Sequence, residues 1–178
     1  MTSRGVPWVL LALVFATPAR GGTAAAQPPP SNVQPSKPTA QESAAVEQRL
    51  SEAVRRHPGS FQAQQALAGF YLQQGKLEAA IPHLERAQAI DPANYANSYD
   101  LAVALLQTGK LDPAREQVRR LLSAKETGEL HNLLGDVEER AGNLVAAAEE
   151  YQRGAHMDPT EDHLFDWGNN LVQLRAFE

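Results

Sequence analysis

The stretch QQGKLEAA, residues 73–80, recurs twice along the chain in nearly the same form. QTGKLDPA occupies residues 107–114 and RAGNLVAA residues 140–147, and each copy has glycine third, leucine fifth and alanine eighth. The glycines Gly75, Gly109 and Gly142 are separated by 34 and then 33 positions. A fixed period of that length is the signature of a repeat protein. The repeat therefore decides the fold.

The sequence on both sides of each glycine predicts an amphipathic helix, because apolar residues recur there at i, i+3, i+4 and i+7. A glycine just past the last periodic residue suits the left-handed conformation that ends a helix. After the second glycine, Asp112 and Pro113 are expected to supply a helix cap and a first helical residue. The pairs Asp91-Pro92 and Asp158-Pro159 are expected to end second helices. Each unit is thus predicted to be a helix, a tight turn and an antiparallel helix.

Two columns of small residues indicate how these helices meet. Small side chains at one place in each helix let the paired backbones approach to the short end of the usual interaxial range. A larger residue in either column is expected to overpack the pair. The first-helix column is Ala68, Ala102, Gly135 and Gly168, and the second-helix column is Ala80, Ala114 and Ala147.

The whole pattern resembles the tetratricopeptide repeat, in which a small residue and Tyr precede the turn and Ala and Pro follow it over 34 residues. Leu67-Ala68, Tyr71, Ala80 and Pro92 satisfy most of that pattern. The resemblance implies an all-α fold, a right-handed α-solenoid of helix-turn-helix repeats. The expected units are a capping half-repeat at 42–60, repeats at 61–94, 95–127 and 128–160, and the first helix of a fourth at 161–178. The usual tryptophan is replaced by Gln64, Ser98, His131 and Leu164, and the closing Asp-Pro is missing from the second repeat.

In this family the first helices line a concave surface, which is the usual binding surface of such solenoids. The resemblance therefore implies a protein-binding groove, although the same positions are also compatible with plain solvated surface. Chaperone-binding members clamp a terminal carboxylate with cationic residues, and the corresponding places here carry no Lys or Arg. We expect instead a protein or extended peptide that is neutral to basic. The groove residues implied are Gln62, Gln65, Tyr99, Val103, Asn132, Asp136, Phe165 and Asn169.

Composition argues against several other functions. The net charge of −5 and the pI near 5.5 provide no basic field for nucleic acid or an anionic membrane. The chain has no cysteine, its five histidines show no metal-ligand spacing, and no nucleophile elbow or phosphate loop is present. We expect a non-catalytic scaffold or adaptor without metal or cofactor. The main alternative is the N-terminal piece of a longer protein with further repeats or an enzyme domain beyond residue 178. A secreted enzyme acting on metals or carbohydrates is a third, weaker possibility.

The N-terminal residues have the pattern of an export signal. Arg4 precedes a short apolar run from Val6 to Ala16, about half the roughly 20 residues that a membrane span needs, and an A-x-A site ends at Ala26. Residues 1–26 are therefore expected to be a cleaved signal peptide, with an uncleaved membrane anchor as the alternative. Residues 27–41 hold five prolines and are expected to form a disordered tether. The mature protein is then periplasmic or secreted.

The C-terminal end is expected to be open. Residues 161–178 supply a first helix without its second, so Trp167 and Phe177 are expected to lack their cover. Exposed apolar area of that kind marks an interaction site. The sequence therefore predicts that the chain self-associates, or frays, through its C-terminal helix.

Overall fold

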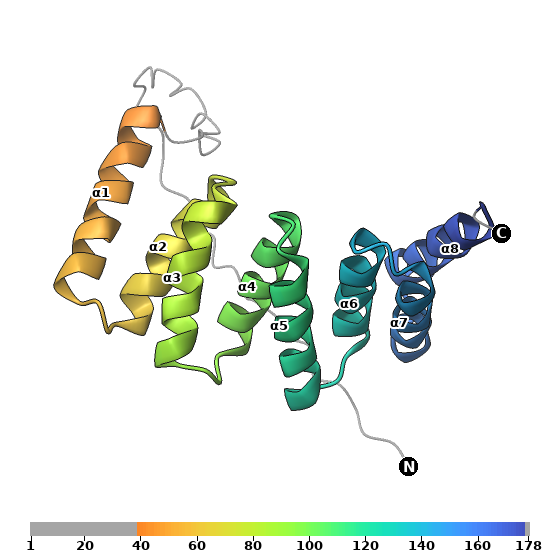
Figure 1. Ribbon diagram of the computed structural model, residues 1–178. Helices are drawn as coiled ribbons and strands as arrows, with labels where there is room; N and C mark the ends of the chain where they lie inside the picture. The colour runs from red at the N-terminus through yellow and green to blue at the C-terminus, as the bar shows by residue number, and fades with distance from the viewer. Residues whose placement is uncertain (1–38, 177–178) are drawn as a thin grey trace, which may run out of the picture. The chain divides into compact units, whose positions relative to one another are not determined.

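The computed structural model describes residues 39–176 as eight α-helices joined by short turns, with no strand in that range (Figure 1). The predicted signal peptide, most of the proline-rich segment and Phe177 lie outside the described residues. Ala40 and Gln41, assigned above to the tether, are already helical, because Thr39 caps the first helix in a reciprocal capping box with Glu42. The helices are α1 (Ala40–Arg56), α2 (Phe61–Gln73), α3 (Leu77–Ile90), α4 (Tyr95–Gln107), α5 (Leu111–Ala124), α6 (Gly128–Arg140), α7 (Leu144–Met157) and α8 (Glu161–Ala176).

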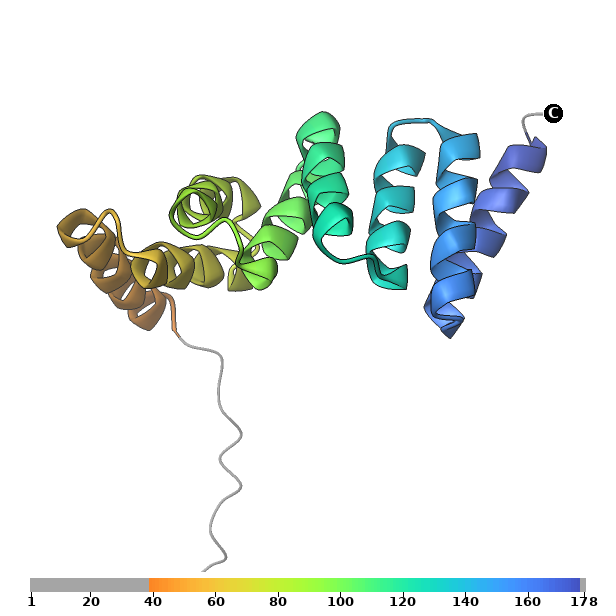
Figure 2. The same cartoon turned by 90° about the horizontal axis from the view of Figure 1, so that it is seen from below.

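The helices pack in chain order, each against the next (Figures 1 and 2). α2 pairs with α3, α4 with α5 and α6 with α7 as antiparallel hairpins, and each second helix also packs on the first helix of the following unit. The predicted all-α helical repeat fold is confirmed. None of the helices in residues 39–176 is long and apolar enough to cross a membrane.

The repeated glycine ends each first helix as predicted. Gly75, Gly109 and Gly142 have φ angles of 68°, 75° and 81°, in the left-handed region that other residues seldom adopt. At the first of them the amide of Gly75 donates to Leu72 O (3.0 Å) and the amide of Lys76 donates to Tyr71 O (2.9 Å). The other two glycines make the same pair of bonds. This double bond pattern is the Schellman motif, which satisfies carbonyls that the helix end leaves free.

The prediction for Asp112 and Pro113 was wrong by two positions. α5 begins at Leu111, directly after the glycine turn, and Lys110 is at the cap position without a side-chain hydrogen bond. The turn itself already orients the chain for the next helix, so a capping side chain is not needed there. Side-chain caps instead begin the first helices, where the sequence analysis had not placed them: Ser60, Asn94, Thr127 and Thr160 each accept a hydrogen bond from an amide three residues on.

The connection that follows the second helix is different in the second repeat. α3 and α7 end as predicted at Asp91 and Asp158, each followed by proline. After α5, Lys125 is extended and Thr127 caps α6 through the amide of Leu130 (3.3 Å). A short extended link therefore replaces the missing Asp-Pro.

Both small-residue columns are at the centres of the hairpins. Ala68, Ala102, Ala80, Ala114 and Ala147 are fully buried. The ring of Tyr151 on α7 lies so close to Gly135 on α6 that a Cβ added to the glycine would be 2.6 Å from it. The alanines of both columns and Gly135 therefore have no room for a larger side chain, as the sequence predicts. Gly168 is the exception, because no atom of the described residues lies within 4 Å of its Cβ position.

Replacing Ala80 by Leu is expected to lower the free energy of unfolding by about 1–3 kcal/mol, because the site is full. Ala89 on the same helix is exposed, so the same change there is expected to alter stability by less than about 0.5 kcal/mol. Urea unfolding of the two variants measures the difference. Equal losses would show that the hairpin contact is not at Ala80.

Candidate functional site

The first helices of successive repeats are linked to one another on one side of the array. Arg140 Nη1 on α6 donates to the carbonyl of Leu106 on α4 (3.1 Å). Asn132 Nδ2 on α6 donates to Asp166 Oδ2 on α8 (2.7 Å). Both bonds join residues 34 positions apart, which is one repeat, and α6 also packs directly on α8. We call the side formed by the predicted groove positions of α2, α4, α6 and α8 the first-helix face.

The eight predicted groove residues lie on these four helices, two on each. Gln62, Phe165 and Asn169 are exposed, whereas Gln65, Tyr99, Val103, Asn132 and Asp136 are half-buried. Tyr99 and Val103 pack against the hydrophobic core. Burial raises the pKa of the Tyr99 phenol well above its ordinary value, and the nearby carboxylate of Glu129 raises it further. The face is therefore apolar and amide-rich on α2 and α4 and acidic on α6 and α8.

Three carboxylates gather where α6 meets α8. The hydroxyl of Tyr151 lies 2.8 Å from Asp136 Oδ1 and 2.7 Å from Glu139 Oε2, and it has one proton to share between them. Burial raises the pKa of Asp136, and the nearby charges of Asp166 and Glu139 raise it further. A proton on Asp136 lets it donate to the phenol oxygen while the phenol donates to Glu139. We call Asp136, Glu139 and Asp166 the acidic cluster.

The sequence suggested that the amide of Asn132 is free to bind a peptide. In the structure it is already engaged. Its Nδ2 is held by Asp166, and its Oδ1 is buried without a hydrogen-bond partner. Gln173 on α8 likewise donates to Glu139. These amides fix α8 against α6, whereas Gln62 and Asn169 remain exposed on the same face.

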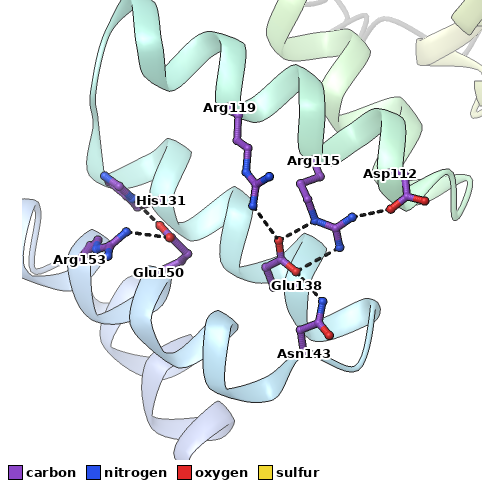
Figure 3. Close-up of polar contacts among 8 residues, drawn as sticks. All are labelled: Asp112, Arg115, Arg119, His131, Glu138, Asn143, Glu150 and Arg153. Carbon is purple, nitrogen blue, oxygen red and sulfur yellow. Dashed lines mark hydrogen bonds and ion pairs between the residues drawn. The ribbon is translucent and has the colours of Figure 1, made fainter.

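The opposite side of the same repeat carries a buried ion pair that the sequence analysis missed (Figure 3). Glu138 is only 4% exposed and occupies the place of Tyr71 and Leu105 in the other repeats. Arg115 on α5 donates to it through Nε (2.7 Å) and Nη2 (3.1 Å), and Asn143 Nδ2 donates at 2.8 Å. The hydrogen bonds from Arg115 hold the pKa of Glu138 below its ordinary range. An acidic residue at a repeat position that is otherwise aromatic or aliphatic was the sequence signal that could have revealed this ion pair.

A second polar contact fills the place of the usual tryptophan. His131 is 5% exposed, with Nδ1 2.7 Å from Glu150 and Nε2 2.9 Å from Glu126. Glu150 also accepts from Arg153 at 2.8 Å (Figure 3). The short link after α5 carries Glu126 to this position. The histidine thus ties the second repeat's exit to the third hairpin.

The C-terminal unit contains a further buried histidine, and the expectation for Trp167 needs a correction. His163 is buried, and its Nδ1 lies 2.7 Å from the carbonyl of Asp158. Trp167 is half-buried, with its ring 6.2 Å from that of His156 on α7, so it does not face an absent second helix. Within residues 39–176 no group of three His, Asp or Glu side chains could hold a metal ion.

Comparison with known proteins agrees with this architecture. Residues 42–95 and residues 71–137 match sequence families that are both described as tetratricopeptide repeat. No curated protein matches the sequence. The solved structure of MamA from Desulfovibrio magneticus RS-1 superposes with a TM-score of 0.68 at 16% identity, over 75% of this chain and 77% of that one. The thermophilic TPR protein TTC0263 of Thermus thermophilus gives a TM-score of 0.57 at 19% identity, over 72% and 74%.

The two neighbouring acids of α6 are expected to affect stability in opposite directions. Glu138 has a lowered pKa, so its contribution is present at neutral pH and is lost as the pH falls through its folded-state pKa. Glu138→Gln is expected to lower the free energy of unfolding at pH 7 by about 2 kcal/mol, since Arg115 loses its charged acceptor. The deficit should shrink below pH 4.5, the ordinary Glu value.

Asp136 has a raised pKa, so its favourable contribution exists at acid pH and is lost as the pH rises through that pKa. Asp136→Asn keeps an acceptor for Tyr151 and removes the charge. It is therefore expected to raise the melting temperature at pH 7 and to have little effect at about pH 3. Thermal unfolding of Glu138→Gln and Asp136→Asn between these two pH values tests both expectations. Melting temperatures that change with pH in the same way for the two variants would contradict them.

Proposed function

The chain belongs to the tetratricopeptide-repeat family, and we propose that it is a non-catalytic scaffold whose first-helix face binds an extended, neutral to basic segment of a partner protein. Solenoids of this kind bind through the surface that their stacked helices present. The face here combines exposed amides, partly buried aromatic and aliphatic side chains, and carboxylates. Such groups pair with a peptide backbone and its cationic side chains.

The acidic cluster is the observation that carries the proposal. Asp136, Glu139 and Asp166 lie close enough for the charges of the other two to raise the pKa of Asp136. The adjacent Arg140 donates to the carbonyl of Leu106, and its single charge offsets only part of that of the three carboxylates. A Lys or Arg of a bound segment would supply the positive charge that three neighbouring carboxylates favour. The face therefore selects cationic side chains over anionic ones.

Apolar side chains on the same face would contribute contact area. On α8, Phe165 is 67% exposed and Val172 is 70% exposed. On α4, the side of Tyr99 that is not packed on the core extends this surface. A segment that alternates basic and apolar residues fits this distribution best, because interfaces are centred on aromatic anchors with charges around them.

Binding of short unstructured peptides tests the proposal. We expect a fluorescent Lys- and Leu-containing peptide to bind, a Glu- and Leu-containing peptide of the same length not to bind, and the affinity to fall as salt is raised. Glu129 on α6 is exposed and lies beside Tyr99 of the same face. The double variant Glu129→Gln with Asp166→Asn should weaken binding about fivefold, because each charge pair contributes modestly. Fluorescence anisotropy measures the dissociation constants.

The matched control removes two negative charges from second helices. Glu116 on α5 and Glu149 on α7 are exposed. Glu116→Gln with Glu149→Gln changes the net charge by the same amount, so equal weakening by both pairs would mean that only the overall field attracts the peptide. Preference for the acidic peptide would contradict the proposal outright.

We further propose that the protein is exported, with residues 1–26 removed and a membrane attachment only if they are retained. The motivation is the cationic start, the short apolar run and the A-x-A site described above. N-terminal sequencing of protein from the native host is expected to begin at Gln27, or at Arg20 if cleavage follows Ala19, a second candidate site. An intact Met1 in cytoplasmic protein would contradict export.

A further inference from the structure

The face of α8 that would carry a second helix is uncovered among the described residues. Leu164 is 48% exposed, whereas the equivalent His131 is 5% exposed and contacts Glu150 on the second helix α7. Leu171, one turn beyond Gly168 on α8, is 46% exposed. Gly168 has no atom within 4 Å of its Cβ position, whereas the equivalent Gly135 would meet the ring of Tyr151 at 2.6 Å. The face thus has the shape of a first helix prepared for close approach by a second one.

At the other end of the array, α1 has the position of a second helix, whereas α8 has that of a first helix. α1 packs on α2 as a second helix does, with Tyr71 donating to Glu47 (3.1 Å), and it ends before Pro58 as α3 ends before Pro92. Counting back from those prolines, the residues Val46, Leu50 and Ala53 correspond to Ala80, Leu84 and Ala87. The α3 residues are buried against α2, while the α1 residues are only half-buried. No first helix of its own covers α1 within residues 39–176.

We propose that α1 of a second copy of this chain binds the uncovered face of α8, so that copies join end to end. The α6–α7 hairpin gives the register of the contact. Gly135 faces Tyr151 there, so Gly168 would face Leu50 of the second copy, which stands at the same distance before its proline. The paired helices would run antiparallel, as they do in every complete repeat.

Charge complements this pairing. In the antiparallel arrangement the start of α8 lies beside the end of α1 of the second copy. The first turn of α8 carries Glu161 and Asp162, both exposed. The last turn of α1 carries Arg55 and Arg56, whose side chains are 72% and 69% exposed. Glu52 pairs with both arginines and offsets one of the two charges, which leaves a positive end to meet a negative one.

A contact between two different surfaces does not close on itself after two copies. Each added chain presents a new free α1 and a new free α8, so growth continues into an open filament unless the rotation between copies closes a ring. The first-helix face is not part of the contact. Joined copies would therefore present a longer binding surface.

Sedimentation velocity over a range of concentrations tests this with the purified protein. The native protein is expected to show mass rising with concentration. Arg55→Glu with Arg56→Glu, and separately Glu161→Arg with Asp162→Arg, should each weaken association by at least about tenfold, because like charges then face each other. An equimolar mixture of the two variants should associate again, since each altered end meets a complementary one.

Gly168→Leu adds a steric test that does not depend on charge. The single chain has open space there, and leucine favours the helix more than glycine does, so the melting temperature should not fall while association is lost. Gly69 on α2 also has no atom within 4 Å of its Cβ position, and Gly69→Leu should leave association intact. A native protein that stays monomeric would overturn the proposal. Association that ignores the α1 changes, as an α8–α8 dimer would, also overturns it.

Discussion

The tight packing of two helices at the small residues of each complete repeat is the contact on which the rest of the structure depends. Ala80 and Ala114 are fully buried against their partners, and a glycine with positive φ precedes each second helix. The tight turn and the small contact together fix each hairpin without a long loop. Once the hairpins are fixed, equivalent side chains of successive first helices lie side by side. Hydrogen bonds one repeat apart, such as Asn132 to Asp166, are the direct consequence.

Two ionisable side chains are buried in the third repeat, and each contacts the second repeat or the link that follows it. Glu138 binds Arg115 of the second repeat, and His131 contacts Glu126 in the link between the two. A buried charge is costly unless it is paired and hydrogen-bonded. These pairs therefore make the second and third hairpins specific for each other. The acidic cluster on the opposite side differs, because its carboxylates face one another, and that difference motivates assigning the binding role to the first-helix face.

Much of the fold was predictable from the sequence because it depends on local rules repeated at a fixed period. Glycine turns, small columns and Asp-Pro ends each have a local physical cause, and apart from Gly168 the structure has them at the predicted residues. The Asp112 cap was misplaced because the glycine turn had already begun the helix. Side-chain pairing across repeats was beyond such rules: nothing local links Glu138 to Arg115 or shows that Asn132 is held by Asp166. Trp167 was assigned to the wrong face because a single first helix has two apolar sides, and only packing on α7 decides between them.

The central claim is that binding uses the first-helix face, and a titration followed by nuclear magnetic resonance addresses it most directly. An isotope-labelled protein is titrated with the Lys- and Leu-containing peptide, and the backbone amide shifts are mapped on the helices. The account predicts shifts concentrated on α4, α6 and α8, with the largest around Asp136 and Asp166 and little change on α3, α5 and α7. Shifts centred on the second helices, or none at saturating peptide, would contradict it.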